Sequence, residues 1–288
     1  VGWMFSDSNI KELDLSDFDT SKWTDMSDIF WDSSAEKINL KGWNTSNVTD
    51  MSSMFEGAYN LSKLDISTFD TSKVTTMSRM FESTSKLNNL DVYNFNTSSV
   101  TDMTSMFASC GATELNVSDF DKSQVTNMSG MFYRCQNLEK LDVSKFNTTN
   151  VTNMSNMFGY LYKLNSLNFE NWDTSNVTNM SYMFGNATGL TSLDLSNFDT
   201  SKVTSMSSMF SGSKFLNLDL RNFNTSSVTS MSNMFALTSN LQSLDVTSFD
   251  TSKVTDMSNM FTRATSLTSL DLSSFDTSGI TTNPSTFY

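Results

Sequence analysis

A phrase of about 25 residues recurs along the whole of this 288-residue chain. The stretch FDTSKVTSMSSMF at 198–210 returns almost unchanged at 69–81 and 249–261. A period of this kind over nearly every residue is typical of a solenoid, in which each coil packs on its neighbours. We therefore expect one domain over residues 1–288. The phenylalanine that closes each copy recurs every 25 or 26 residues, which indicates about eleven coils: Phe5, Phe30, Phe55, Phe81, Phe107, Phe132, Phe158, Phe184, Phe210, Phe235 and Phe261.

One copy can be written L-x-x-L-D-L-S-x-F-D-T-S-x-V-T-x-M-S-x-M-F, followed by about five variable residues. All 20 methionines fall in its two Met positions. The alternation of apolar and polar residues at Leu193, Asp194 and Leu195 predicts a half-buried strand, and successive coils should pair these strands in parallel. The expected class is α/β, a leucine-rich-repeat-like solenoid.

A short helix or 3-10 turn is expected to follow each strand. Asp199 fits the N-cap of such a helix, because its carboxylate can accept the free N–H groups of the first turn. Val203, Met206 and Phe210 would then share one apolar helical face. Ser and Thr are poor helix formers, so the element should be short. Each coil is thus predicted to hold one short parallel strand and one such turn.

The wording of the repeat resembles a known family. LDLSNFDTSKVTSMSSMF at 193–210 is similar to the bacterial surface-protein repeat of about 26 residues that is grouped with BspA-like leucine-rich repeats. The resemblance covers residues 1 to about 282. It implies a solenoid outside a bacterium, associated with adhesion to host or neighbouring cells, and it carries no catalytic residues to transfer. Attachment would be to the cell wall or through a lipid anchor, by parts outside this chain.

The two ends of the chain differ. Trp3, Met4 and Phe5 keep the core pattern of the repeat, so we expect the array to continue before residue 1 in a longer surface protein. Near residue 282, Pro284 stands where the pattern would continue, which predicts the end of the array.

The composition argues against several functions. The chain has 31 acidic and 18 basic residues, a net charge of -13, and nucleic-acid binding would need a basic patch. It has no histidine, which removes the commonest general base and metal ligand, and no phosphate-binding or zinc motif is visible. The sequence contains no run of 18 apolar residues, so it predicts no membrane insertion. We expect no enzyme activity and no cofactor.

Cys110 and Cys135 are the two cysteines, and they lie one period apart in the same position of the repeat. Stacked strands about 4.8 Å apart fall within the Cα separation of a disulfide, so the geometry allows a bond between neighbouring coils. Such a bond would suit an extracellular protein. Two buried thiols that fill a small space are the alternative, and both remain open at this point.

Acidic or amide side chains recur in the middle of the L-D-L strand. Stacked carboxylates repel, and hydrogen bonds from nearby N–H and hydroxyl groups are the simplest compensation. Bound Ca²⁺ is a minor alternative, because it needs six to eight oxygen ligands and no clustered calcium loop is visible. The row comprises Asp14, Asn39, Asp65, Asp91, Asn116, Asp142, Asn168, Asp194, Asp219, Asp245 and Asp271. No metal-binding residue is assigned.

Specificity should lie where the copies differ. Tyr133, Arg134, Tyr160, Tyr162 and Tyr182 gather in three consecutive copies. Exposed aromatic residues on a rigid scaffold suit the recognition of a sugar or a protein, whereas the alternative is that they cover seams between coils. We expect a module that binds glycans or proteins of host or neighbouring cells. A structural stalk that displays another domain is the alternative function.

Overall fold

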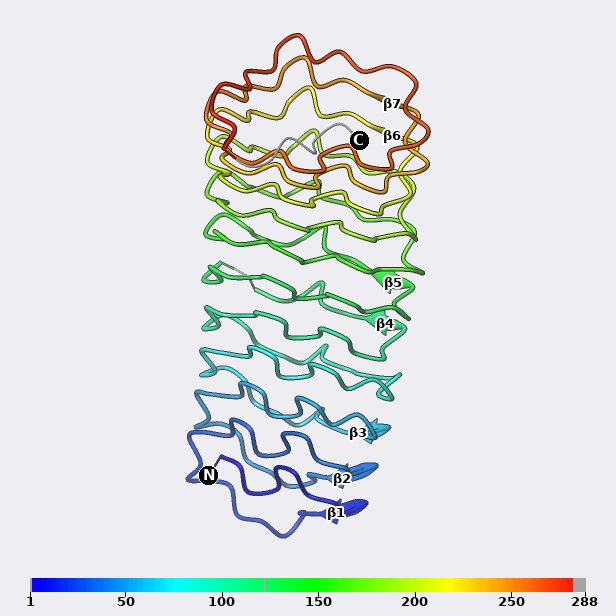
Figure 1. Ribbon diagram of the computed structural model, residues 1–288. Helices are drawn as coiled ribbons and strands as arrows, with labels where there is room; N and C mark the ends of the chain where they lie inside the picture. Colours follow the sequence, from blue (N-terminus) through cyan, green and yellow to red (C-terminus); the bar gives the residue numbers. More distant parts are fainter. Residues whose placement is uncertain (1, 122, 282–288) are drawn as a thin grey trace.

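The computed structural model describes residues 2–121 and 123–281. The chain winds into a stack of similar coils, with the short strands along one side (Figure 1). The predicted repeat solenoid is therefore confirmed, while the number of about eleven coils stays a prediction. The strands are β1 (Glu12–Asp14), β2 (Lys37–Asn39), β3 (Lys63–Leu64), β4 (Glu114–Leu115), β5 (Lys140–Leu141), β6 (Asn217–Leu218) and β7 (Ser243–Leu244).

The strands pair in parallel, as the sequence predicts. β1 pairs with β2 and β2 with β3, and the pairs β4–β5 and β6–β7 form further along the stack. Paired residues are one repeat apart in the sequence: Glu12 lies opposite Lys37, and Leu13 lies opposite Ile38. Leu13 and Ile38 are buried between exposed neighbours. A second parallel ladder, of single bridges, runs from Asp25 to residue 256 on another side of the coils.

The short helix or 3-10 turn expected after each strand is wrong for the described residues, which contain neither. Met206 and Phe210 donate their N–H groups to the carbonyl oxygens of Ser230 and Met234 in the next coil, each at 3.0 Å. An α-helix would direct these groups to carbonyls four residues earlier in the same coil. Inter-coil bonding therefore replaces the helix. Successive turns, such as the 3.1 Å bond from the Met209 N–H to the Met206 carbonyl, fold the segment instead.

The turns need left-handed backbone at two positions of each copy. One is two residues before the closing phenylalanine, as at Ser208 with φ of 57°, and the other is two residues after it, as at Gly212 with φ of 67°. Side chains branched at Cβ are strongly disfavoured in this conformation, and none occupies either position in the described coils. Among the residues at these positions are Asp28, Ser53, Arg79, Arg134, Asn156, Tyr160, Tyr182, Asn233 and Arg263.

The closing phenylalanines form one continuous column through the core. From Phe5 to Phe261 the rings of consecutive copies stack with centroids 5.3 to 5.9 Å apart and interplanar angles of 5° to 10°. The methionines of the repeat lie beside this column, and Met206 and Met209 are fully buried. Offset stacking of this kind adds to the burial of large apolar surface. The core is therefore a stack of equal layers.

A buried threonine at the F-D-T corner links neighbouring coils. The hydroxyl of Thr225, which is 1% exposed, donates to the carbonyl of Asp250 at 2.9 Å and accepts its N–H at 2.8 Å. Both main-chain groups of Asp250 are thus satisfied by one side chain. The same reciprocal pair occurs in Thr20–Asn44, Thr45–Asp70, Thr71–Asn96, Thr148–Asp173 and Thr251–Asp276.

Replacing Thr225 with Val tests this link, since Val keeps the shape and removes both hydrogen bonds. We expect Thr225→Val to lower the free energy of unfolding by about 1–3 kcal/mol, because the buried polar groups of Asp250 lose their partner. The matched control is Thr229→Val, whose exposed hydroxyl donates to the Thr204 carbonyl at 3.2 Å. Urea unfolding measures both, and equal losses in the two variants would contradict the buried link.

Candidate functional site

The structure brings together the five residues that the sequence singles out: Tyr133, Arg134, Tyr160, Tyr162 and Tyr182. We call them the tyrosine–arginine patch. Arg134, Tyr160 and Tyr182 occupy the left-handed positions, with φ of 57°, 59° and 58°. Their N–H groups donate to carbonyl oxygens of the following coil at 2.9, 2.8 and 2.8 Å. The backbone under the patch is therefore held by the same ladder as the rest of the solenoid.

The rings of the patch contact one another across three consecutive coils. The centroid of Tyr160 lies 5.5 Å from that of Tyr133, 5.7 Å from that of Tyr182 and 6.3 Å from that of Tyr162. The Arg134 guanidinium carbon lies 4.9 Å from the ring centroid of Tyr160 and 5.2 Å from that of Tyr133, within cation–π range. Tyr160 is thus the centre of the patch.

Two glycines make room for these rings. A Cβ at Gly185 would lie 2.5 Å from the Tyr182 ring, and one at Gly159 would lie 3.1 Å from the Tyr133 ring and 3.2 Å from the Tyr182 ring. The position after the closing phenylalanine carries a larger side chain in other copies, such as Trp31. Sequence reasoning missed Gly159 and Gly185, although two successive glycines at one repeat position were a visible signal.

The patch residues differ in exposure. Tyr162 is 44% exposed, Arg134 is exposed, and Tyr133, Tyr160 and Tyr182 are partly buried. Burial raises the pKa of Tyr182 above its ordinary value. The side-chain amide of Asn186 donates to the Tyr182 hydroxyl. The patch therefore combines fixed inner rings with an accessible tyrosine and an accessible cation.

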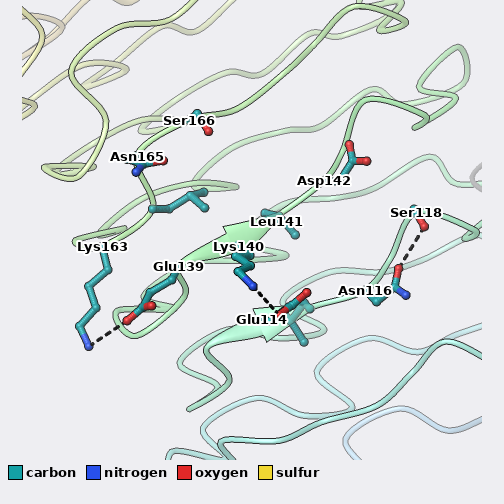
Figure 2. Close-up of a pocket in the computed structure, with 12 residues that line it drawn as sticks. Glu114, Asn116, Ser118, Glu139, Lys140, Leu141, Asp142, Lys163, Asn165 and Ser166 are labelled. Atoms are coloured by element: carbon teal, nitrogen blue, oxygen red, sulfur yellow. Dashed lines mark hydrogen bonds and ion pairs between the residues drawn. The ribbon is translucent and has the colours of Figure 1, made fainter.

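A polar groove lies on the strand side of the solenoid, over β4, β5 and the following coil (Figure 2). It has a volume of about 930 Å³. Lys140 bonds Glu114 at 3.4 Å, and the Lys163 ammonium lies 3.8 Å from Glu139. All four side chains are exposed, and such pairs contribute about 0–1 kcal/mol each. These lysines are already paired, whereas Arg134 has no carboxylate partner among the residues that the structure describes.

The row of acidic and amide side chains on the strand side forms a series of Asx turns. The Asp14 carboxylate accepts the N–H and the hydroxyl of Ser16, at 3.1 and 2.7 Å, and Asp194 accepts the N–H of Ser196 at 3.0 Å. These hydrogen bonds lower the pKa of both carboxyl groups. The expectation that nearby N–H and hydroxyl groups compensate the row is confirmed. Asp199, expected as a helix N-cap, makes the same turn with Ser201 at 2.9 Å.

Calcium along this row gains no support from the geometry. In residues 2–121 and 123–281, no three His, Cys, Asp or Glu side chains are placed to hold a metal ion together. One oxygen of each carboxylate, such as Oδ1 of Asp14 and of Asp194, accepts the hydrogen bonds of its own turn. Within the same residues, no helix has the length and hydropathy of a transmembrane span.

The two cysteines are free and buried thiols in the structure. The Cys135 thiol donates to the Phe107 carbonyl at 2.9 Å. Burial raises the pKa of Cys110 and, more strongly, that of Cys135. The disulfide that the sequence allows between Cys110 and Cys135 stays a prediction.

The pH dependence of stability follows from these turns and can be tested at Asp219. Hydrogen bonds from Arg221 lower its pKa from 3.8 to about 2. A lowered pKa stabilises the fold above the pKa of the unfolded chain, and this contribution is lost as the pH falls from about 4 to about 2. Asp219→Asn keeps a turn-forming side chain, as Asn168 does naturally. We expect the difference in thermal midpoint between the wild type and Asp219→Asn to shrink over that range. A constant difference would contradict the assignment.

The repeat can now be compared with known proteins. Residues 1–119, 106–193 and 189–288 match a family model described as "Mycoplasma protein of unknown function, DUF285". The chain belongs to this family. The resemblance to BspA-like surface repeats that was drawn from the sequence is confirmed at the family level. No curated protein matches the chain.

Several solved structures show partial similarity to this DUF285 chain. A leucine-rich repeat protein from Eubacterium ventriosum is 15% identical with a TM-score of 0.35, and the match covers 67% of this chain and 63% of that one. A leucine-rich cell surface protein from Faecalibacterium prausnitzii is 14% identical with a TM-score of 0.27, over 92% of this chain and 83% of that one. The chain thus spans less than two thirds of the Eubacterium protein.

Proposed function

We propose that this DUF285 chain is a non-enzymatic recognition module on the surface of a bacterium. It binds glycans or proteins of a host or of neighbouring cells, and it needs no cofactor. It lies outside the cell and is held there by parts beyond this chain, through the cell wall or a lipid anchor. The tyrosine–arginine patch is its binding surface.

The observation that carries this proposal is the gathering of non-repeating side chains on a repeating scaffold. Most positions of the coil serve the core, the turns or the links between coils, and they recur in most copies. The patch tyrosines vary from copy to copy, yet their rings meet at 5.5 to 6.5 Å. Tyrosine and arginine are the side chains that most often dominate binding energy at protein surfaces. A rigid backbone beneath them reduces the entropy lost on binding.

The runner-up function is a stalk that displays another domain. The uninterrupted phenylalanine column favours it, because a stack of equal layers makes a stiff spacer without any specific surface. A stalk requires nothing of the patch. The two functions therefore predict different results for the isolated chain and for patch variants.

The test is binding of the isolated chain to an array of glycans and cell-surface proteins. A recognition module binds a selected subset, and Tyr160→Ala together with Tyr162→Ala lowers that binding at least tenfold, since both rings lose their contact area. The control is Tyr93→Ala, an exposed tyrosine outside the patch. Circular dichroism checks that the fold is kept.

No selective binding by the wild type would leave the stalk as the function. Equal binding by the patch variant and the Tyr93 control would remove the patch from the proposal.

A further inference from the structure

Arg134 holds a positive charge that is not neutralised, in a chain of net charge -13. The groups that act on its charge are Tyr133 and Tyr160, and no carboxylate of the described residues pairs with it. Two other arginines behave differently: Arg79 lies 3.8 Å and Arg221 2.6 Å from a carboxylate. Arg134 is therefore free to pair with an anion from outside the chain.

A small pocket opens beside Arg134. Its volume is about 250 Å³, and it is lined by Ser85, Ser109, Gln136 and Asn137 together with Arg134. Among the described residues that line it, Arg134 has the only formal charge. Hydroxyl and amide groups can both donate and accept hydrogen bonds, as sugar hydroxyls require. The volume is below the ~300–1,000 Å³ of sites for drug-sized ligands, so one sugar unit is a suitable occupant.

A glycine shapes the wall of this pocket. A Cβ at Gly111 would lie 2.2 Å from the carbonyl oxygen of Ser85, so a side chain cannot be accommodated there without moving the backbone. The Gly111 N–H donates to the Thr84 carbonyl of the preceding coil at 3.1 Å. Other copies carry a side chain at this position, from Ser85 to Tyr59. The pocket is thus a local departure from the repeat.

We propose that Arg134 and this pocket bind the carboxylate or sulfate group of an acidic saccharide. A guanidinium has five N–H donors, so those of Arg134 that are not directed at Tyr133 and Tyr160 can donate to the oxygens of a carboxylate or a sulfate. The sugar ring that bears the anion enters the pocket, and the next ring lies against Tyr160 and Tyr162, whose faces suit the apolar side of a pyranose. This inference rests on the proposed function and specifies its ligand.

The experiment is a glycan array with matched pairs, probed with the 288-residue chain. The pairs are hyaluronan with its carboxyl-reduced form, sialylated with unsialylated N-acetyllactosamine, and carboxyl-reduced chondroitin sulfate with the same polymer after desulfation. These arms separate a carboxylate from a sulfate as the recognised group. We expect the chain to bind acidic members and to bind their neutral partners at least tenfold more weakly. Added salt should weaken the binding, because the contact is ionic and exposed.

Variants of two arginines complete the test. Arg134→Gln should lower binding of the acidic glycans about tenfold, the loss expected when one charge-assisted contact is removed. Arg263→Gln is the control, because Arg263 is exposed, has φ of 58° and occupies the same repeat position. Thermal melting should be unchanged in both variants.

Equal binding of neutral partners, unchanged binding by Arg134→Gln, or binding of proteins alone would overturn the acidic-saccharide site and leave the recognition function standing. No binding of any glycan or protein would overturn both.

Discussion

The stacked phenylalanine column is the constraint on which the rest of this solenoid depends. Each ring stacks on the ring of the next copy with centroids 5.3 to 5.9 Å apart, so every coil must bring its phenylalanine back to the same lateral position, one layer further along the stack. The N–H groups of every second residue from Met206 to Gly212 then donate to carbonyl oxygens of the next coil. The parallel strands and the buried threonines fall into the same register, so three kinds of link repeat with one period.

This register also creates the patch. Tyr133, Tyr160 and Tyr182 are separated by 27 and 22 residues in the sequence, yet coil stacking places their rings in contact. Glycines at 159 and 185 leave space for those rings, and Arg134 rests on two of them. Repetition provides the rigid support, and the departures from repetition provide a chemically distinct surface.

Much of the fold and some of the site follow from the sequence. Periodicity alone predicts the solenoid, the parallel strands and the apolar core, because these depend on which residues recur. Clustering of the patch is also predictable, since residues in adjacent copies must be neighbours. The prediction of a helix after each strand is wrong. The spacing of Val203, Met206 and Phe210 fits one face of a helix, but it fits a turned segment bonded to the next coil equally well. Inter-coil hydrogen bonds decide between them, and a single copy does not contain that information.

Two further features needed the structure, although their signals were present in the sequence. The lack of side chains branched at Cβ two residues before and after each closing phenylalanine marks the left-handed turns. The sequence does not reveal the role of the threonine in F-D-T, because threonine is common in turns. Its burial becomes visible only when the Asp250 main chain is seen against the Thr225 hydroxyl. Lys122 stands at this position in one copy and lies outside the described residues.

The most direct measurement is the free energy of unfolding of Phe132→Ala, because Phe132 stacks between Phe107 and Phe158 beneath the patch. If the column carries the fold, this variant loses about 3–5 kcal/mol in urea unfolding. Tyr93→Ala, at an exposed site, should change stability by no more than about 0.5 kcal/mol. A loss below about 1 kcal/mol for Phe132→Ala would contradict the central role of the column.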